Sequence, residues 1–97
     1  MVLNNTQYVD RCKEIGVMPR YGRSRIQHKM ALKKATARAD SFGLEEMNIS
    51  GMSREEAESV LLARSKDQAV GISGLELFFL QAIFGWIIRK ILNRMFQ

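Results

Sequence analysis

The apolar positions recur at helical intervals in three successive segments. They predict helices over residues 6–15, 24–42 and 53–70. Gly16 follows the first as a helix stop, Ser24 takes the N-cap position of the second, and Ser53 with Glu56 has the capping-box spacing at the start of the third. No segment alternates with period two over enough residues to predict a strand, so the sequence indicates an all-α fold.

The predicted apolar faces of these three helices are narrow. They consist of Tyr8, Val9, Cys12 and Ile15 in the first helix, Ile26, Met30, Ala37 and Phe42 in the second, and Ala57, Val60, Leu61 and Ala69 in the third. A helix with so thin an apolar face packs lightly or lies on a partner. We therefore expect residues 1–70 to form three short, lightly packed amphipathic helices.

The pattern changes after a Gly/Ser hinge at residues 71–74. A helix over residues 75–97 is apolar around most of its circumference, and residues 77–88 contain no charged side chain. The preceding helices offer few large side chains to bury it, so we predict a membrane anchor. The predicted anchor residues are Leu77, Phe78, Phe79, Leu80, Ile83, Phe84, Trp86, Ile87 and Ile88.

A polar stripe runs along this helix, because Gln81, Gly85 and Arg89 recur every four residues. Glycine permits close approach of two backbones, and glutamine can form a hydrogen bond between helices. We interpret these three residues as a helix-packing stripe turned toward a protein partner. Three placements of the helix stay open: it spans a membrane, lies on one, or is buried in protein as the core of a bundle or assembly.

The charges are arranged in blocks that the net charge of +5 conceals. Residues 11–38 contain nine Lys and Arg and one acid, whereas residues 40–67 contain seven acids and three bases. The basic block predicts contact with a polyanion, either lipid head groups or nucleic acid bound without sequence specificity. The predicted contact residues are Arg20, Arg23, Arg25, Lys29, Lys33, Lys34 and Arg38, with Tyr21 available to stack on a base.

Nothing in the sequence indicates catalysis. His28 is the only histidine and Cys12 the only cysteine, too few for a structural zinc site or an intrachain disulfide. No glycine-rich phosphate loop is present, and the titratable residues show no spacing that is typical of an active site. We therefore expect no catalytic residue, no metal, no cofactor and no small-molecule substrate.

These patterns favour a non-enzymatic structural protein associated with a membrane, as a component of a virion or of a multisubunit membrane complex. Its C-terminal helix would anchor it in the bilayer, and its basic segment would lie on the cytoplasmic or interior side, since no secretory signal is evident. Expected partners are membrane lipid and other protein subunits or further copies of the chain. The alternative is a soluble nucleic-acid-binding module that oligomerises through its C-terminal helix.

Overall fold

All secondary structure in the described part of the chain is helical. The computed structural model describes residues 3–96, the side chains of residues 41 and 43–46 excepted. Within these residues it contains no strand, and its elements are α1 (Asn5–Ile15), α2 (Arg25–Ala39), the 3₁₀ helix η1 (Asp40–Ile49), α3 (Arg54–Gln68) and α4 (Gly74–Met95). The predicted all-α class is confirmed, whereas position 97, predicted at the end of the last helix, lies outside the described residues.

Side-chain caps fix the starts of α1 and α3. Asn4 and Gln7 form a capping box, in which Asn4 Oδ1 accepts the Gln7 N–H at 2.8 Å and Gln7 Oε1 accepts the Asn4 N–H at 3.0 Å. Ser53 Oγ accepts the Glu56 N–H at 3.2 Å, as its spacing predicted. Gly16 ends α1 in the left-handed conformation, with φ of 78°, which confirms the predicted helix stop.

The boundaries of α2 differ from the prediction. Ser24 precedes the helix, but its side chain makes no capping hydrogen bond. The α-helix ends at Ala39, before the predicted Phe42, and the chain continues directly as η1. The chain therefore continues as a tighter helix to Ile49, beyond residue 42, where the sequence predicted the second helix to end.

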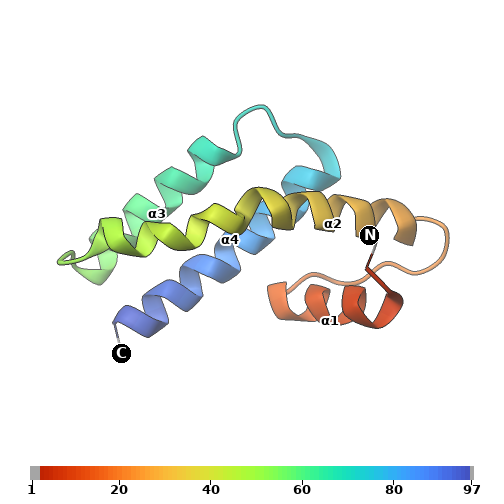
Figure 1. The fold of residues 1–97 in the computed structure, drawn as a ribbon, viewed down its shortest axis with the longest axis horizontal. Coiled ribbons are helices and arrows are strands. Elements are labelled where there is room, and N and C mark those ends of the chain that lie inside the picture. Colours follow the sequence, from red (N-terminus) through yellow and green to blue (C-terminus); the bar gives the residue numbers. More distant parts are fainter. Residues whose placement is uncertain (1–2, 97) are drawn as a thin grey trace.

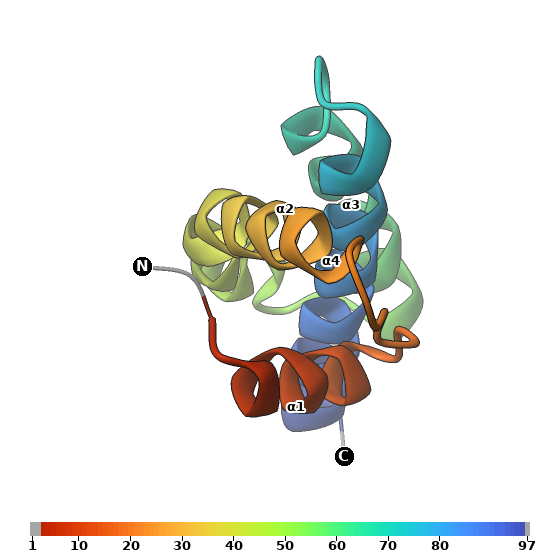
Figure 2. The ribbon, with the colours of Figure 1, turned by 90° about the vertical axis from the view of Figure 1, so that its right-hand side faces the viewer.

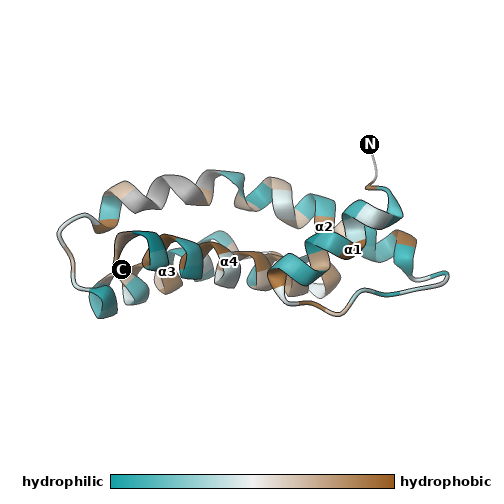
Figure 3. Cartoon of the chain, turned by 90° about the horizontal axis from the view of Figure 1, so that it is seen from below, coloured by the Kyte–Doolittle hydropathy of each residue, from teal (hydrophilic) through white to brown (hydrophobic). Residues whose placement is uncertain are grey.

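Helix α4 is the centre of the arrangement, and α1, α2, η1 and α3 all pack against it. In Figure 1, α2 crosses in front of α4 while α3 runs alongside α4 in the opposite direction. Turned by 90°, Figure 2 places α1 below α2, with α4 behind them. Figure 3 shows α2 as one layer and α1, α3 and α4 as a second, with hydrophobic residues concentrated along α4.

The core is formed by α4 and by both large and small side chains that pack around it. From the predicted anchor, Phe79, Leu80, Ile83, Phe84 and Ile88 are buried in this core. The neighbouring elements cover them with Tyr8, Cys12, Ala31, Leu32, Ala35, Ala39, Phe42, Ile49, Ala57 and Leu61. The expectation that the preceding helices offer too little to bury α4 is wrong, because large side chains such as Tyr8, Leu32 and Phe42 are fully buried in this core and alanines fill the space between them.

The prediction of a membrane-spanning anchor has no support in the structure. Among the described residues, no helix combines the length and hydropathy needed to cross a bilayer. The charge-free stretch of α4 is limited to residues 77–88, well short of the ~20 apolar residues that a spanning helix requires. Of the predicted anchor residues, Leu77, Trp86 and Ile87 are half-buried, and only Phe78 is largely exposed.

The predicted apolar face of the second helix is wrong at three of its four positions, since only Phe42 is buried. Ile26, Met30 and Ala37 lie on the exposed side of the helix. The side that faces α4 carries Leu32, Ala35 and Ala39 with Ala31 and Lys29. Two large apolar residues, Ile26 and Met30, are thus left on the surface, while Leu32 and three alanines form the buried side of α2.

Candidate anion-binding face

The predicted polyanion contacts fall into two groups in the structure. Arg20, Arg23, Lys33 and Lys34 are exposed. Within the described residues, none of these four side chains forms an ion pair. A base without a protein partner remains available to an external anion, so these four are the best placed of the predicted contacts.

The other three predicted contacts are less available to an external anion, because their side chains are bonded within the chain or partly buried. Lys29 is 9% exposed, and its ammonium donates to the Asn5 side chain, which ties α2 to the start of α1. Arg38 Nε pairs with Glu76 of α4 at 2.5 Å. Arg25 is half-buried. The sequence could not separate these residues from the exposed bases, because lysines and arginines along one helix look alike until its buried side is known.

Large apolar side chains lie among the exposed bases. Ile26 is 65% exposed and Met30 is 47% exposed, and the positions 26, 30 and 33 follow the three- and four-residue spacing of one helix side. Arg23 lies in the turn just before this helix. In the preceding loop, Met18 and Tyr21 are exposed as well. We call the exposed side chains of Arg23, Ile26, Met30, Lys33 and Lys34 the basic–apolar face. It combines positive charge with aliphatic surface, and it includes the two large residues that the sequence pattern assigned to the core.

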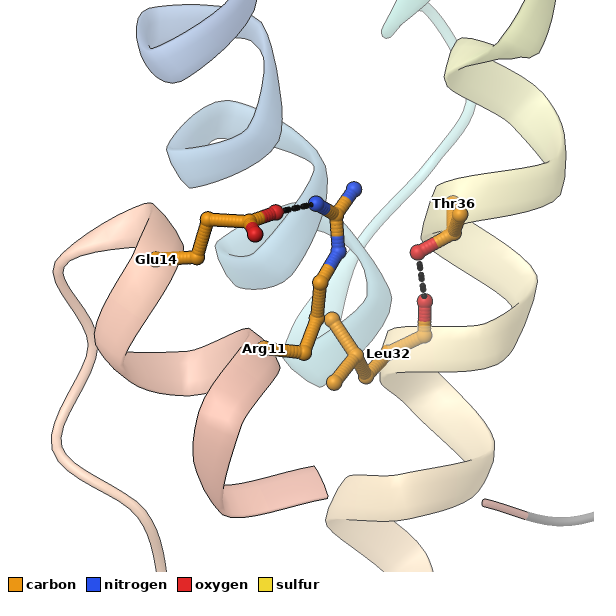
Figure 4. Close-up of polar contacts among 4 residues, drawn as sticks. All are labelled: Arg11, Glu14, Leu32 and Thr36. Carbon is orange, nitrogen blue, oxygen red and sulfur yellow. Dashed lines mark hydrogen bonds and ion pairs between the residues drawn. The ribbon is translucent and has the colours of Figure 1, made fainter. Parts of the chain in front are cut away.

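A second cationic cluster, which the sequence analysis missed, joins α1 to α4. The Arg11 guanidinium lies 4.5 Å from the centre of the Trp86 ring, and Lys90 Nζ lies 4.3 Å from it. Figure 4 shows Arg11 reaching from α1 toward the space beside α2 and pairing with Glu14 of its own helix. The i,i+3 spacing of Arg11 and Glu14 was visible in the sequence, but their approach to Trp86 depends on the fold.

The space between α1 and α2 next to this cluster is a shallow groove of about 360 Å³. Arg11, Lys33 and Thr36 line it together with Asp40. The Thr36 hydroxyl donates to the Leu32 carbonyl of its own helix at 2.8 Å (Figure 4). Because Asp40 places a carboxylate in the lining and Arg11 is paired with Glu14, this groove is less suited to an anion than the basic–apolar face.

The helix-packing stripe points away from the core. Gln81 and Arg89 are exposed and Gly85 is half-buried. Gln81 and Gly85 form part of a groove between α3 and α4.

The two residues most often used as nucleophile and base are placed in unreactive surroundings. Burial raises the pKa of the Cys12 thiol, and burial also raises the pKa of the neighbouring Tyr8, whose hydroxyl accepts the Arg20 N–H at 2.8 Å. A thiol with a raised pKa is a poor nucleophile at neutral pH. His28 packs edge-on against Phe79, with ring centres 5.7 Å apart. Among the described residues, no three potential metal ligands gather at one point.

Stability is expected to decrease as the pH falls through the titration range of His28. Desolvation lowers the pKa of His28 below its ordinary value of 6.5, and the positive charge of Arg20 lowers it further. The unfolded chain therefore takes up the proton first, so the contribution of His28 is complete above pH 6.5 and is lost as the pH decreases toward the folded-state pKa. Melting temperatures measured across this range should depend less on pH in His28→Gln. Parallel profiles for the two proteins would contradict the assignment.

Comparison with known proteins adds no further constraint: no protein-family model, no curated protein and no solved structure matches this chain.

Proposed function

We propose that this protein is a non-enzymatic structural protein that binds the surface of an anionic membrane through the basic–apolar face of α2. The proposal rests on one observation: Ile26 and Met30 are exposed on the same helix side as Lys33 and Lys34, and Arg23 is exposed in the turn just before the helix. Surface-bound amphipathic helices place aliphatic side chains in the head-group boundary and bases against lipid phosphates. Each base near such a surface contributes about 1 kcal/mol to binding.

The charge distribution also supports binding in this orientation. Helix α2 carries five bases and no acid, whereas α3 carries four acids and three bases. The two helices lie in different layers (Figure 3). An anionic surface would therefore attract the layer that contains α2 and turn it toward the lipid.

The membrane contact proposed here differs from the anchor predicted from the sequence. Insertion of α4 would expose its buried partners on α1, α2 and α3 to water, since α4 provides the common core of the fold. Binding through α2 requires no such rearrangement. It leaves the fold intact and uses side chains that are already exposed.

The test is flotation of the full chain with vesicles of phosphatidylcholine alone or mixed with an equal amount of phosphatidylglycerol. We expect binding to the mixed vesicles only. The triple variant Arg23→Gln, Lys33→Gln, Lys34→Gln should bind about 100-fold more weakly, because three contributions of about 1 kcal/mol are lost. The double variant Ile26→Ser, Met30→Ser should also weaken binding, since serine removes the aliphatic contact and keeps the charge.

A matched control changes two exposed bases outside this face. Lys66→Gln, Arg89→Gln should leave vesicle binding close to that of the unchanged protein. Equal binding by the triple variant would contradict the proposal, and so would resistance to carbonate extraction, which would indicate an inserted helix. Tight salt-dependent binding to single-stranded RNA without vesicle binding would favour the nucleic-acid-binding alternative.

A further inference from the structure

A groove of about 420 Å³ lies between α3 and α4, two helices that run side by side (Figure 1). Most of its lining is apolar and comes from Leu62, Ala69, Val70, Leu77, Phe84 and Ile88. Sites for small ligands are mostly apolar clefts of about 300–1,000 Å³ with a few polar groups that orient the ligand. The volume and the lining of this groove fall within that description.

Gly85 leaves the middle of the groove open. It lies in the interior of α4, where glycine destabilises a helix relative to alanine, and it is not among the glycines with positive φ. A Cβ atom at this position would approach only Arg89 Nη1, at an ordinary contact distance of 3.7 Å. Packing within the described chain therefore does not require glycine here, and the absence of a side chain leaves space for a ligand.

The polar groups at the groove are positive or neutral. Lys66 and Ser65 come from α3 and Gln81 comes from α4, while the Arg89 guanidinium lies beside Gly85. No acidic residue lines the groove in the part of the chain that the structure describes. A second copy of the chain docked groove to groove would bring these bases close to their own counterparts, which is unfavourable. The complementary ligand is apolar with one negative end.

The length of the groove suits one hydrocarbon chain. The stretch of α4 from Leu77 to Ile88 is about 16 Å long at the helical rise per residue. One leaflet of a bilayer, half of a hydrocarbon core of about 30 Å, places an acyl chain across roughly 15 Å. The groove and a single extended chain are therefore of similar length.

We propose that the groove between α3 and α4 binds a fatty acid. The hydrocarbon chain lies over Gly85 against Phe84 and Leu77, and the carboxylate pairs with Arg89 and Lys66. Lys66 lines the groove, so its aliphatic stem can cover part of the chain, and the Arg89 guanidinium lies beside Gly85. This site is separate from the basic–apolar face, so the proposal does not depend on the proposed membrane contact.

The test uses the full chain and the fluorescent probe dansylundecanoic acid, kept below its micelle concentration. We expect saturable binding, with displacement by dodecanoate. Gly85→Leu should bind the probe at least about tenfold more weakly, since the loss of contact with about two methylene groups has that effect. Gly85→Ala is the milder variant, and thermal melting should show both to be folded.

A charge variant tests the carboxylate separately from the shape of the groove. Dodecanoate should displace the probe better than dodecanol by about tenfold in the unchanged protein. In Lys66→Gln, Arg89→Gln this preference should disappear, while the triple variant of the basic–apolar face should retain it. Absence of probe binding, or equal binding by folded Gly85→Leu, would overturn the proposal. A dimer that Gly85→Leu dissociates would also overturn it, because the groove would then be covered by a second copy.

Discussion

Replacement of Phe79 by alanine is expected to lower the free energy of unfolding by about 3–5 kcal/mol, a large part of the roughly 5–15 kcal/mol available to a domain. The Phe79 side chain is fully buried, and its ring packs edge-on against His28 of α2. Its removal would leave a cavity where α2 crosses α4. The decrease in unfolding free energy is large because two contributions are lost: the burial of the ring's apolar atoms away from water, and the contacts that the atoms around the cavity made with the ring.

The neighbouring Phe78 provides the matched control. It is 50% exposed, and its ring contacts Phe79 edge-on with centres 5.4 Å apart. Phe78→Ala should cost about 1 kcal/mol or less, since half of its surface is already in water. Urea unfolding followed by far-UV circular dichroism would measure both variants. Equal losses would contradict the packing of α4 described here, because a helix surrounded by lipid would not distinguish the two positions in this way.

Enlarging the alanine seam of α2 is expected to have the second largest effect. Ala35 is completely buried where α2 packs on α4, and Ala31 and Ala39 line the same contact. Ala35→Leu should destabilise the protein by about 1–3 kcal/mol, because the extra atoms force the two helices apart or into strained rotamers.

Ala37→Leu tests whether this loss depends on position. Ala37 lies on the exposed side of α2, so leucine there keeps the helix propensity and meets no neighbour that it must displace. We expect a change within about 0.5 kcal/mol. Thermal and urea unfolding would compare the two variants. If Ala37→Leu proved the more damaging, the side of α2 that the sequence pattern favoured would be the buried one after all.

The helices were predictable from local signals. The capping pattern of Ser53 and Glu56 and the stop at Gly16 are confirmed, because caps and left-handed glycines act within a few residues of chain. The first and third helices also bury the predicted residues Tyr8, Cys12, Ala57 and Leu61. In the first helix, and in the third apart from the exposed Leu62, the large apolar side chains lie mainly on one side, so the pattern favoured one interpretation.

The packing of α2 and α4 was not predictable in the same way. Large apolar residues outweigh alanine in any search for an apolar face, so Ile26 and Met30 were assigned to the core of α2. Where two helices pack closely, the side that carries the small alanine residues can be the buried one instead. The conclusion that α4 had too few partners is wrong because residues outside the predicted apolar faces, Leu32 and Ile49 among them, are also fully buried around α4.

The candidate sites depend on this tertiary information. The basic block identified the exposed bases, but only the fold separates them from Lys29 and Arg38, whose charges are bonded within the chain. The groove between α3 and α4 has no signal of its own in the sequence. Its nearest indication was the spacing of Gln81, Gly85 and Arg89, which pointed to an occupied surface without indicating the kind of occupant.

The central position of α4 also matters for how the protein is made. A ribosome extends the chain by about 5–20 residues per second from its N-terminus, so α1, α2 and α3 are synthesised before their common partner. Until then, Tyr8, Leu32 and Leu61 lack the surface that buries them in the finished protein. The nascent chain should therefore remain unfolded and open to chaperones up to the synthesis of α4, and fold only afterwards. A stalled chain that ends before residue 74 should accordingly be more sensitive to protease than one that includes α4 beyond the ribosomal tunnel.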